Sequence, residues 1–132
     1  MGSLDLSKLE LQDIDGTVGP SNFFAGAITV TTQSLNSPAR VTMLSGLYLD
    51  VNGFTNGATL TSTITLSIGA GNLARTFTST FVKNATNTCW PVVDTEIPLR
   101  PVASAFVLQV QSDNAGDVAV TVPFHYMARS VS

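Results

Sequence analysis

A segment near the middle of the chain constrains the fold more than any other feature. In residues 58–69, threonine and serine alternate with a set of apolar side chains of one parity: Leu60, Ile64, Leu66 and Ile68. Successive side chains of a strand point to opposite faces, so this spacing gives one apolar face and one hydroxyl face. No helical spacing gathers these residues into one stripe, and β-branched residues favour a pleated surface. The segment is therefore predicted to be a strand with one face on a core.

The same alternation recurs through the rest of the chain. Further strands are predicted at residues 26–32, 40–51, 73–83, 89–99, 103–111 and 118–127. Turn residues such as Asn52-Gly53 and Asn56-Gly57 separate them. About seven strands at this spacing, with no convincing helix, predict an all-β fold, an antiparallel β-sandwich of the jelly-roll or immunoglobulin-like type. Local patterns leave the strand order, and so the choice between these two types, open.

Three finer expectations concern individual strands. Pro91 and Pro98 interrupt residues 89–99, which favours an edge position because proline cannot donate to a sheet ladder. Gly46 is a candidate β-bulge within residues 40–51. In the last strand one face is expected to carry five residues: Val118, Val120, Val122, Phe124 and Tyr126.

Residues 1–22 differ from the remainder, and we predict an N-terminal arm there, extended or carrying a short strand, followed by a sandwich domain at residues 23–132. The apolar residues of the arm are spaced by two and three, which suits neither a helix face nor one regular strand: Leu4, Leu6, Leu9, Leu11 and Ile14. These side chains are the predicted partner-binding residues, and they are expected to fill a groove on a neighbouring subunit. The alternative is that the arm lies along its own domain.

The charge content limits the classes of partner. Charged residues form 11% of the chain, well below the usual quarter, and the net charge of −3 matches the charge of the first fifteen residues. No basic stripe is present to displace counterions from phosphates, so neither nucleic acid nor an acidic membrane surface is an expected partner. No apolar run approaches the length of a membrane span. So few charges indicate a surface that other chains cover.

Few residues are candidates for chemistry. His125 is the only histidine and has no marked nucleophile or orienting partner in the sequence, so a surface or interface role is expected. Cys89 is the only cysteine, and a small buried packing residue is the expected role. Residues 13–16 (Asp-Ile-Asp-Gly) resemble the opening of a calcium loop but lack its later ligands, so turn chemistry is the better account. We expect no enzyme activity, no cofactor and no metal site.

The leucine-bearing acidic arm (residues 4–14), the sandwich rich in threonine, serine, valine and alanine, and the low charge together resemble small virion proteins of tailed bacteriophages. Among these the chain is most similar to head decoration, or cement, proteins. The resemblance implies a trimeric or otherwise clustered protein that clamps neighbouring copies of the major capsid protein, or other virion proteins, from outside the shell. It implies no catalytic residues.

The leading hypothesis is therefore a structural virion protein, made in the host cytoplasm, that decorates or cements a phage capsid through arm exchange and sheet-edge contacts. The single cysteine and the absence of a secretory signal favour that compartment. The alternative hypothesis is a tail-fibre or host-attachment module that recognises a surface glycan. In that case Phe54 or Trp90 is expected to be an exposed loop aromatic.

Overall fold

The computed structural model describes residues 9–34, 41–67, 74–99 and 105–131, and every regular element within them is a β-strand. In chain order the strands are β1 (Leu9–Ser21), β2 (Ile28–Ser34), β3 (Val41–Asp50), β4 (Thr59–Ser67), β5 (Ala74–Val82), β6 (Cys89–Val93), β7 (Ile97–Leu99), β8 (Ala105–Ser112) and β9 (Val120–Val131). No helix in the described residues is long and apolar enough to cross a membrane.

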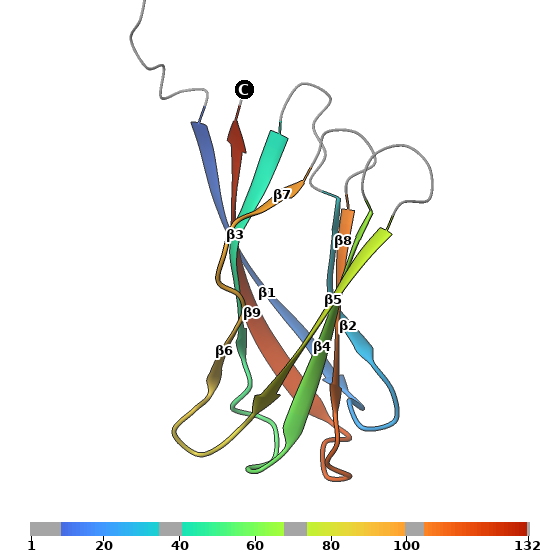
Figure 1. Cartoon of the computed structure of the whole chain (residues 1–132). Helices are drawn as coiled ribbons and strands as arrows, with labels where there is room; N and C mark the ends of the chain where they lie inside the picture. The colour runs from blue at the N-terminus through green and yellow to red at the C-terminus, as the bar shows by residue number, and fades with distance from the viewer. Residues whose placement is uncertain (1–8, 35–40, 68–73, 100–104, 132) are drawn as a thin grey trace, which may run out of the picture.

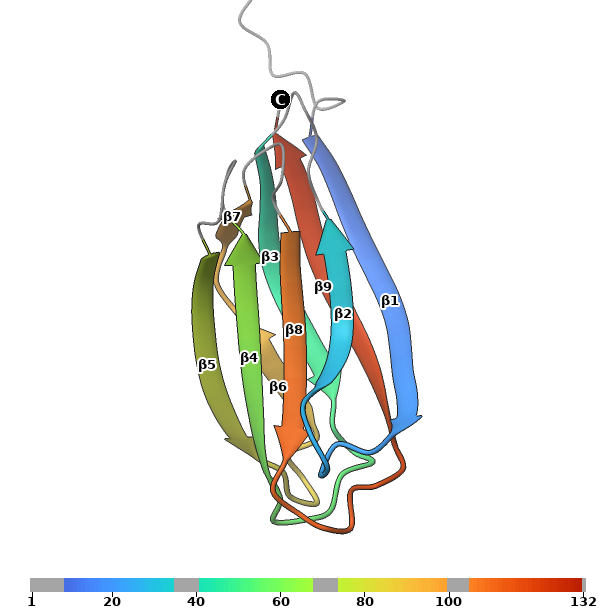
Figure 2. The ribbon, with the colours of Figure 1, turned by 90° about the vertical axis from the view of Figure 1, so that its right-hand side faces the viewer.

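The strands form two antiparallel sheets that pack face to face (Figure 1). The five-stranded sheet has the order β1-β9-β3-β6, with β7 also paired to β3, and the four-stranded sheet has the order β2-β8-β4-β5 (Figure 2). An immunoglobulin-like sandwich keeps its first two strands in one sheet, whereas β1 and β2 lie in different sheets here. With β6 and β7 counted as one interrupted strand, this is the order of a jelly roll. The predicted β-sandwich is confirmed, and the strand order selects the jelly-roll alternative.

The core lies between the two sheets and follows the alternation seen in the sequence. On β4 the predicted apolar face is buried, with Leu60 fully enclosed and Ile64 and Leu66 beside it. Ser62 shares this face and is also buried, and its hydroxyl lies 2.8 Å from that of Ser79 on β5. A hydrogen bond therefore satisfies the one polar group on the buried face. Ile68 lies outside the described residues.

The last strand confirms most of its predicted face. Val120, Val122 and Tyr126 are buried, and Phe124 packs against the core from a half-buried position. The expectation for Val118 was wrong, because this residue is 50% exposed. It lies in the loop before β9 begins and so does not take part in the alternation of the strand.

The proline-interrupted segment 89–99 is two short strands, β6 and β7, which both pair with β3 at the edge of the five-stranded sheet. This confirms the predicted edge position. The register between β3 and β9 shifts between Leu44 and Gly46, which confirms the predicted irregularity at that glycine.

The β1–β2, β3–β4 and β8–β9 loops lie at the end of the sandwich away from the C-terminus (Figure 2). Asp117, in the β8–β9 loop, joins them. Its side chain is 1% exposed and accepts hydrogen bonds from the backbone N–H and hydroxyl of Thr55, and from the hydroxyl of Ser112. Its backbone carbonyl accepts hydrogen bonds from the N–H groups of Phe23 and Phe24. Asp117 therefore joins the β1–β2, β3–β4 and β8–β9 connections, the first through its backbone carbonyl and the other two through its buried carboxylate.

Candidate functional site

The residues of the predicted arm lie partly in the sandwich itself. Leu9, Leu11 and Ile14 belong to β1, where they are paired with residues of β9 in the same chain. Ile14 also packs against the core. For residues 9–21 a single chain thus shows the alternative arrangement, in which this segment lies along its own domain. Leu4 and Leu6 lie outside the described residues, and the arm's role in binding a partner stays a prediction.

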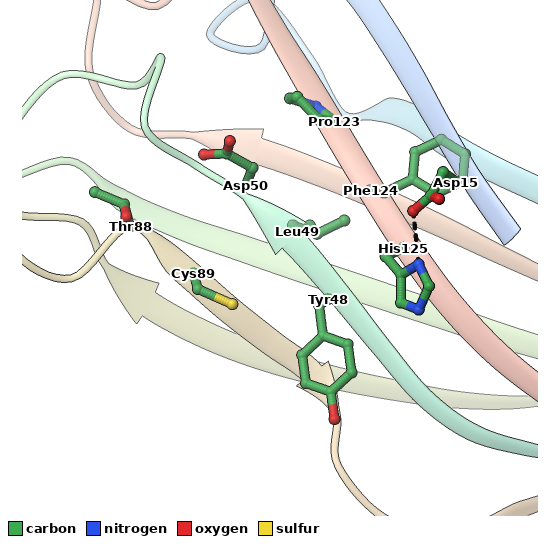
Figure 3. A pocket seen from close by; sticks show the side chains of 9 residues that line it. All are labelled: Asp15, Tyr48, Leu49, Asp50, Thr88, Cys89, Pro123, Phe124 and His125. Atoms are coloured by element: carbon green, nitrogen blue, oxygen red, sulfur yellow. Dashed lines mark hydrogen bonds and ion pairs between the residues drawn. The ribbon is translucent and has the colours of Figure 1, made fainter. Parts of the chain in front are cut away.

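The outer face of the five-stranded sheet gathers the polar residues that the sequence analysis considered separately (Figure 3). His125 of β9 is paired in register with Asp15 of β1 on one side and with Tyr48 of β3 on the other. His125 Nδ1 lies 2.6 Å from Asp15 Oδ1, and His125 Nε2 lies 3.5 Å from Asp13 Oδ1. The histidine therefore has two carboxylate partners that are far from it in the sequence.

This cluster ties β1 to β9, but it is open to water. The side chain of His125 is 36% exposed, and those of Asp13 and Asp15 are 69% and 84% exposed. Exposed contacts of this kind, which are ion pairs only when the imidazole is protonated, typically contribute about 0–1 kcal/mol to stability. The turn expected at residues 13–16 was wrong, because these residues are continuous β-strand. Within the described part of the chain, no group of three or more histidine, cysteine or acidic residues is arranged to hold a metal ion.

A shallow depression of about 360 Å³ opens beside this histidine (Figure 3). Its lining comes from β1, β3, β6, β9 and the residue before β6: Asp15, Tyr48, Leu49, Asp50, Thr88, Cys89, Pro123, Phe124 and His125. The Tyr48 ring, two hydroxyls (of Tyr48 and Thr88) and two carboxylates therefore share one open surface. A few hydrogen-bonding groups among apolar and aromatic side chains are the usual lining of a small-ligand site.

Cys89 is exposed, so the expectation of a buried packing residue was wrong. On the edge strand β6 its side chain has the outward parity, while the next residue, Trp90, faces the core. Strand β3 separates β6 from β9, which places Cys89 two strand spacings, about 10 Å, from the strand of His125. A thiol needs a base within hydrogen-bond reach to act as a nucleophile, and this pair lacks that contact.

The aromatic residues proposed for glycan stacking are buried, so this expectation was also wrong. Trp90 is 3% exposed and stacks on Phe81, with ring centroids 5.4 Å apart. Phe54 is 3% exposed and packs edge-on against Phe23 at 5.1 Å. Large rings at the sandwich ends close the core, and no pattern in the local sequence distinguishes such a position from an exposed loop.

The outer face of the four-stranded sheet has a different character. Threonines on β4 lie directly opposite threonines on β5, in three cross-strand pairs: Thr61 with Thr80, Thr63 with Thr78 and Thr65 with Thr76. On the other side of β4, Gln109 and Gln111 of β8 lie opposite Thr63 and Thr61. We call these eight residues the threonine face. It carries hydroxyl and amide groups and no charge.

Comparisons with known proteins identify no family for this chain. No family model matches it, and no curated protein sequence matches it. One chain in a structure of infectious bursal disease virus, Gt strain, aligns with 93% of this chain at 12% sequence identity and a TM-score of 0.36. The alignment spans 32% of that viral chain, so the protein has about a third of its length.

Proposed function

We propose that this protein is a structural virion protein that decorates or cements a phage capsid, and that it acts through buried contacts rather than catalysis. The threonine face carries the proposal. An isolated soluble domain ordinarily exposes charged side chains, whereas this face presents none and the whole chain has 11% charged residues. The centres of interfaces between protein chains are depleted of charged residues, so a broad, uncharged sheet surface is suited to such contact.

Two further features support this proposal. Four large apolar side chains are notably exposed among the described residues: Phe24, Phe77, Val82 and Val118. Jelly rolls also occur in viral capsid proteins, which is an analogy at the level of fold only. The partners proposed are other copies of this chain, in a trimer or similar cluster, and the major capsid protein or other virion proteins.

Residues 1–8, with Leu4 and Leu6, are the part of the predicted arm that remains for contacts between subunits. Residues 9–15 belong to β1, so removing them would take away half of an edge strand and expose the core around Ile14. Deletion of residues 1–8 therefore separates assembly from folding. Burying two leucines contributes several kcal/mol at roughly 25 cal/mol per Å² of apolar surface.

Native mass spectrometry of the full chain and of the chain lacking residues 1–8 tests the proposal. We expect oligomers of the full chain, and smaller or weaker oligomers after the deletion, with the melting temperature of the sandwich retained. A full-length chain that stays monomeric throughout the micromolar range would contradict the structural role. Oligomers unchanged by the deletion would remove the arm from the proposal and leave the sheet contacts.

The depression beside His125 favours a second candidate function, recognition of a surface glycan. Tyr48 offers a ring for stacking, and Asp15 and Asp50 offer acceptors for sugar hydroxyls within the same hollow. Titration with a glycan panel tests this function. Binding that disappears in Tyr48→Ala and persists in Trp90→Phe, a change within the core, would support it.

A further inference from the structure

β5 is an edge strand that lacks the usual protection against pairing with another chain. It ends the four-stranded sheet and pairs with β4 through nine consecutive residues without a register shift. The side chains of residues 75–80 are all exposed. The strand contains no proline, no lysine and no acidic residue, and its only charged residue is Arg75, near one end. Natural proteins block such edges with prolines, charges, bulges or short strands.

The other edges of the two sheets do carry these features. β1 includes Pro20 and the acidic residues Asp13 and Asp15. β2 is interrupted by a register shift between Thr29 and Thr31. The opposite edge of the five-stranded sheet is split into β6 and β7, each of which contains a proline. Among the described strands, β5 is therefore the edge that is long, regular and unblocked.

Phe77 shows that this edge is incomplete in a single chain. It is paired with Ile64 of β4, a buried residue, and so it lies on the core side of the sheet. It nevertheless remains 36% exposed, since the described residues provide no strand beyond β5 to cover it. The guanidinium of Arg75 lies 4.8 Å from the centre of its ring and covers part of it.

We propose that β5 pairs antiparallel with β5 of a second copy, around a two-fold axis at Thr78. This inference rests on the proposed structural function and names its contact. With Thr78 opposite Thr78 of the other copy, residues 74–82 of the two strands are paired over their whole length. Ala74 then faces Val82, Thr76 faces Thr80 and Phe77 faces Ser79 of the other copy. The two Phe77 rings become diagonal neighbours on one face, within aromatic contact distance.

The charges and the symmetry also fit a second copy as the occupant. Arg75 faces Phe81 in this register, and the two Arg75 residues lie about 20 Å apart, so the pairing creates no repulsion. The threonine face becomes continuous across the contact. A two-fold contact joins two copies by the same patch, so it links neighbouring clusters rather than closing a ring of three.

Introducing like charges at the axis tests the pairing. In Thr78→Lys two like charges face each other across the axis, and the same is true of Thr78→Glu. We expect each variant to self-associate at least about fivefold more weakly than the wild type at low salt. An equal mixture of the two variants is expected to restore association, because lysine then faces glutamate. Sedimentation velocity measures both effects.

Thr121→Lys is the matched control, since it adds the same charge to an exposed residue of β9, an interior strand of the other sheet. It is expected to associate like the wild type. If Thr78→Lys oligomers match those of the wild type, or if mixing restores nothing, the β5 contact is wrong while the structural function stands. If the wild-type chain itself is monomeric, the proposed function fails and the contact fails with it.

Discussion

Replacing Asp117 by alanine removes the carboxylate that links the β8–β9 loop to the β3–β4 loop and to the end of β8. The backbone carbonyl that accepts hydrogen bonds from the β1–β2 loop stays in place. The side chain is 1% exposed and receives three hydrogen bonds, from the N–H of Thr55 at 2.9 Å, from its hydroxyl at 2.8 Å, and from the hydroxyl of Ser112. Ser112 is 3% exposed, so its hydroxyl has no access to water as a replacement partner. Thr55 is exposed, and its groups become hydrated in the variant.

These environments set the size of the effect. A hydrogen bond to a charged group contributes about 1.5–3 kcal/mol, and a buried donor left without a partner costs about 1–3 kcal/mol. Because water replaces the carboxylate at Thr55 but not at Ser112, we expect a loss of about 2–4 kcal/mol in the free energy of unfolding. Asp117→Asn keeps an acceptor for Thr55 and the shape of the side chain, so the free energy of unfolding is expected to fall by only about 1 kcal/mol.

Urea denaturation at a fixed protein concentration measures these differences, since association would otherwise add to the apparent stability. Asp113→Ala is the control: this exposed residue of the same loop accepts a hydrogen bond of 2.8 Å from the N–H of Thr59. Its loss is expected to cost under about 1 kcal/mol. An Asp117→Ala variant as stable as the control would refute the role of the Asp117 carboxylate in linking the β3–β4 and β8–β9 loops.

Three further outcomes follow from the packing. Leu108→Ala, at a fully buried position on β8, is expected to lower the free energy of unfolding by about 2–5 kcal/mol in urea denaturation. Gly16→Ala is expected to cost about 1–3 kcal/mol, because the added Cβ would overlap the Phe124 ring; unchanged melting would contradict this contact. Burial raises the pKa of Tyr126 above its usual value of 10.0. The stability that this shift provides is present below pH 10 and is lost as the pH rises through the folded-state pKa, so alkaline destabilisation should be smaller in Tyr126→Phe than in Tyr48→Phe.

Period-two patterning predicted most of the sandwich because a half-buried strand carries its own signal. Leu60, Ile64 and Leu66 are buried as their spacing indicates. β1 was not predicted as a regular strand, since the leucines before residue 12 are irregularly spaced. A usable signal was present nearby: Ile14 and Val18 pack on the core around Gly16, and the residues between them, Asp15 and Thr17, are exposed.

The strand order and the surroundings of His125 depend on pairings between distant parts of the chain. Asp15 and His125 are separated by 110 positions, and no local pattern records that β1 lies beside β9. Burial of Trp90 and exposure of Cys89 follow from the parity of an edge strand whose register only the folded sheet defines. These features depend on contacts between residues far apart in the chain, so local patterns in a single sequence do not predict them.

Sedimentation equilibrium of the wild-type chain over a dilution series tests most directly whether its uncharged sheet surface is covered by other copies. The account predicts a mass well above the 13.8 kDa of one chain in the micromolar range, falling toward that value on dilution. A mass of one chain at every concentration would contradict it.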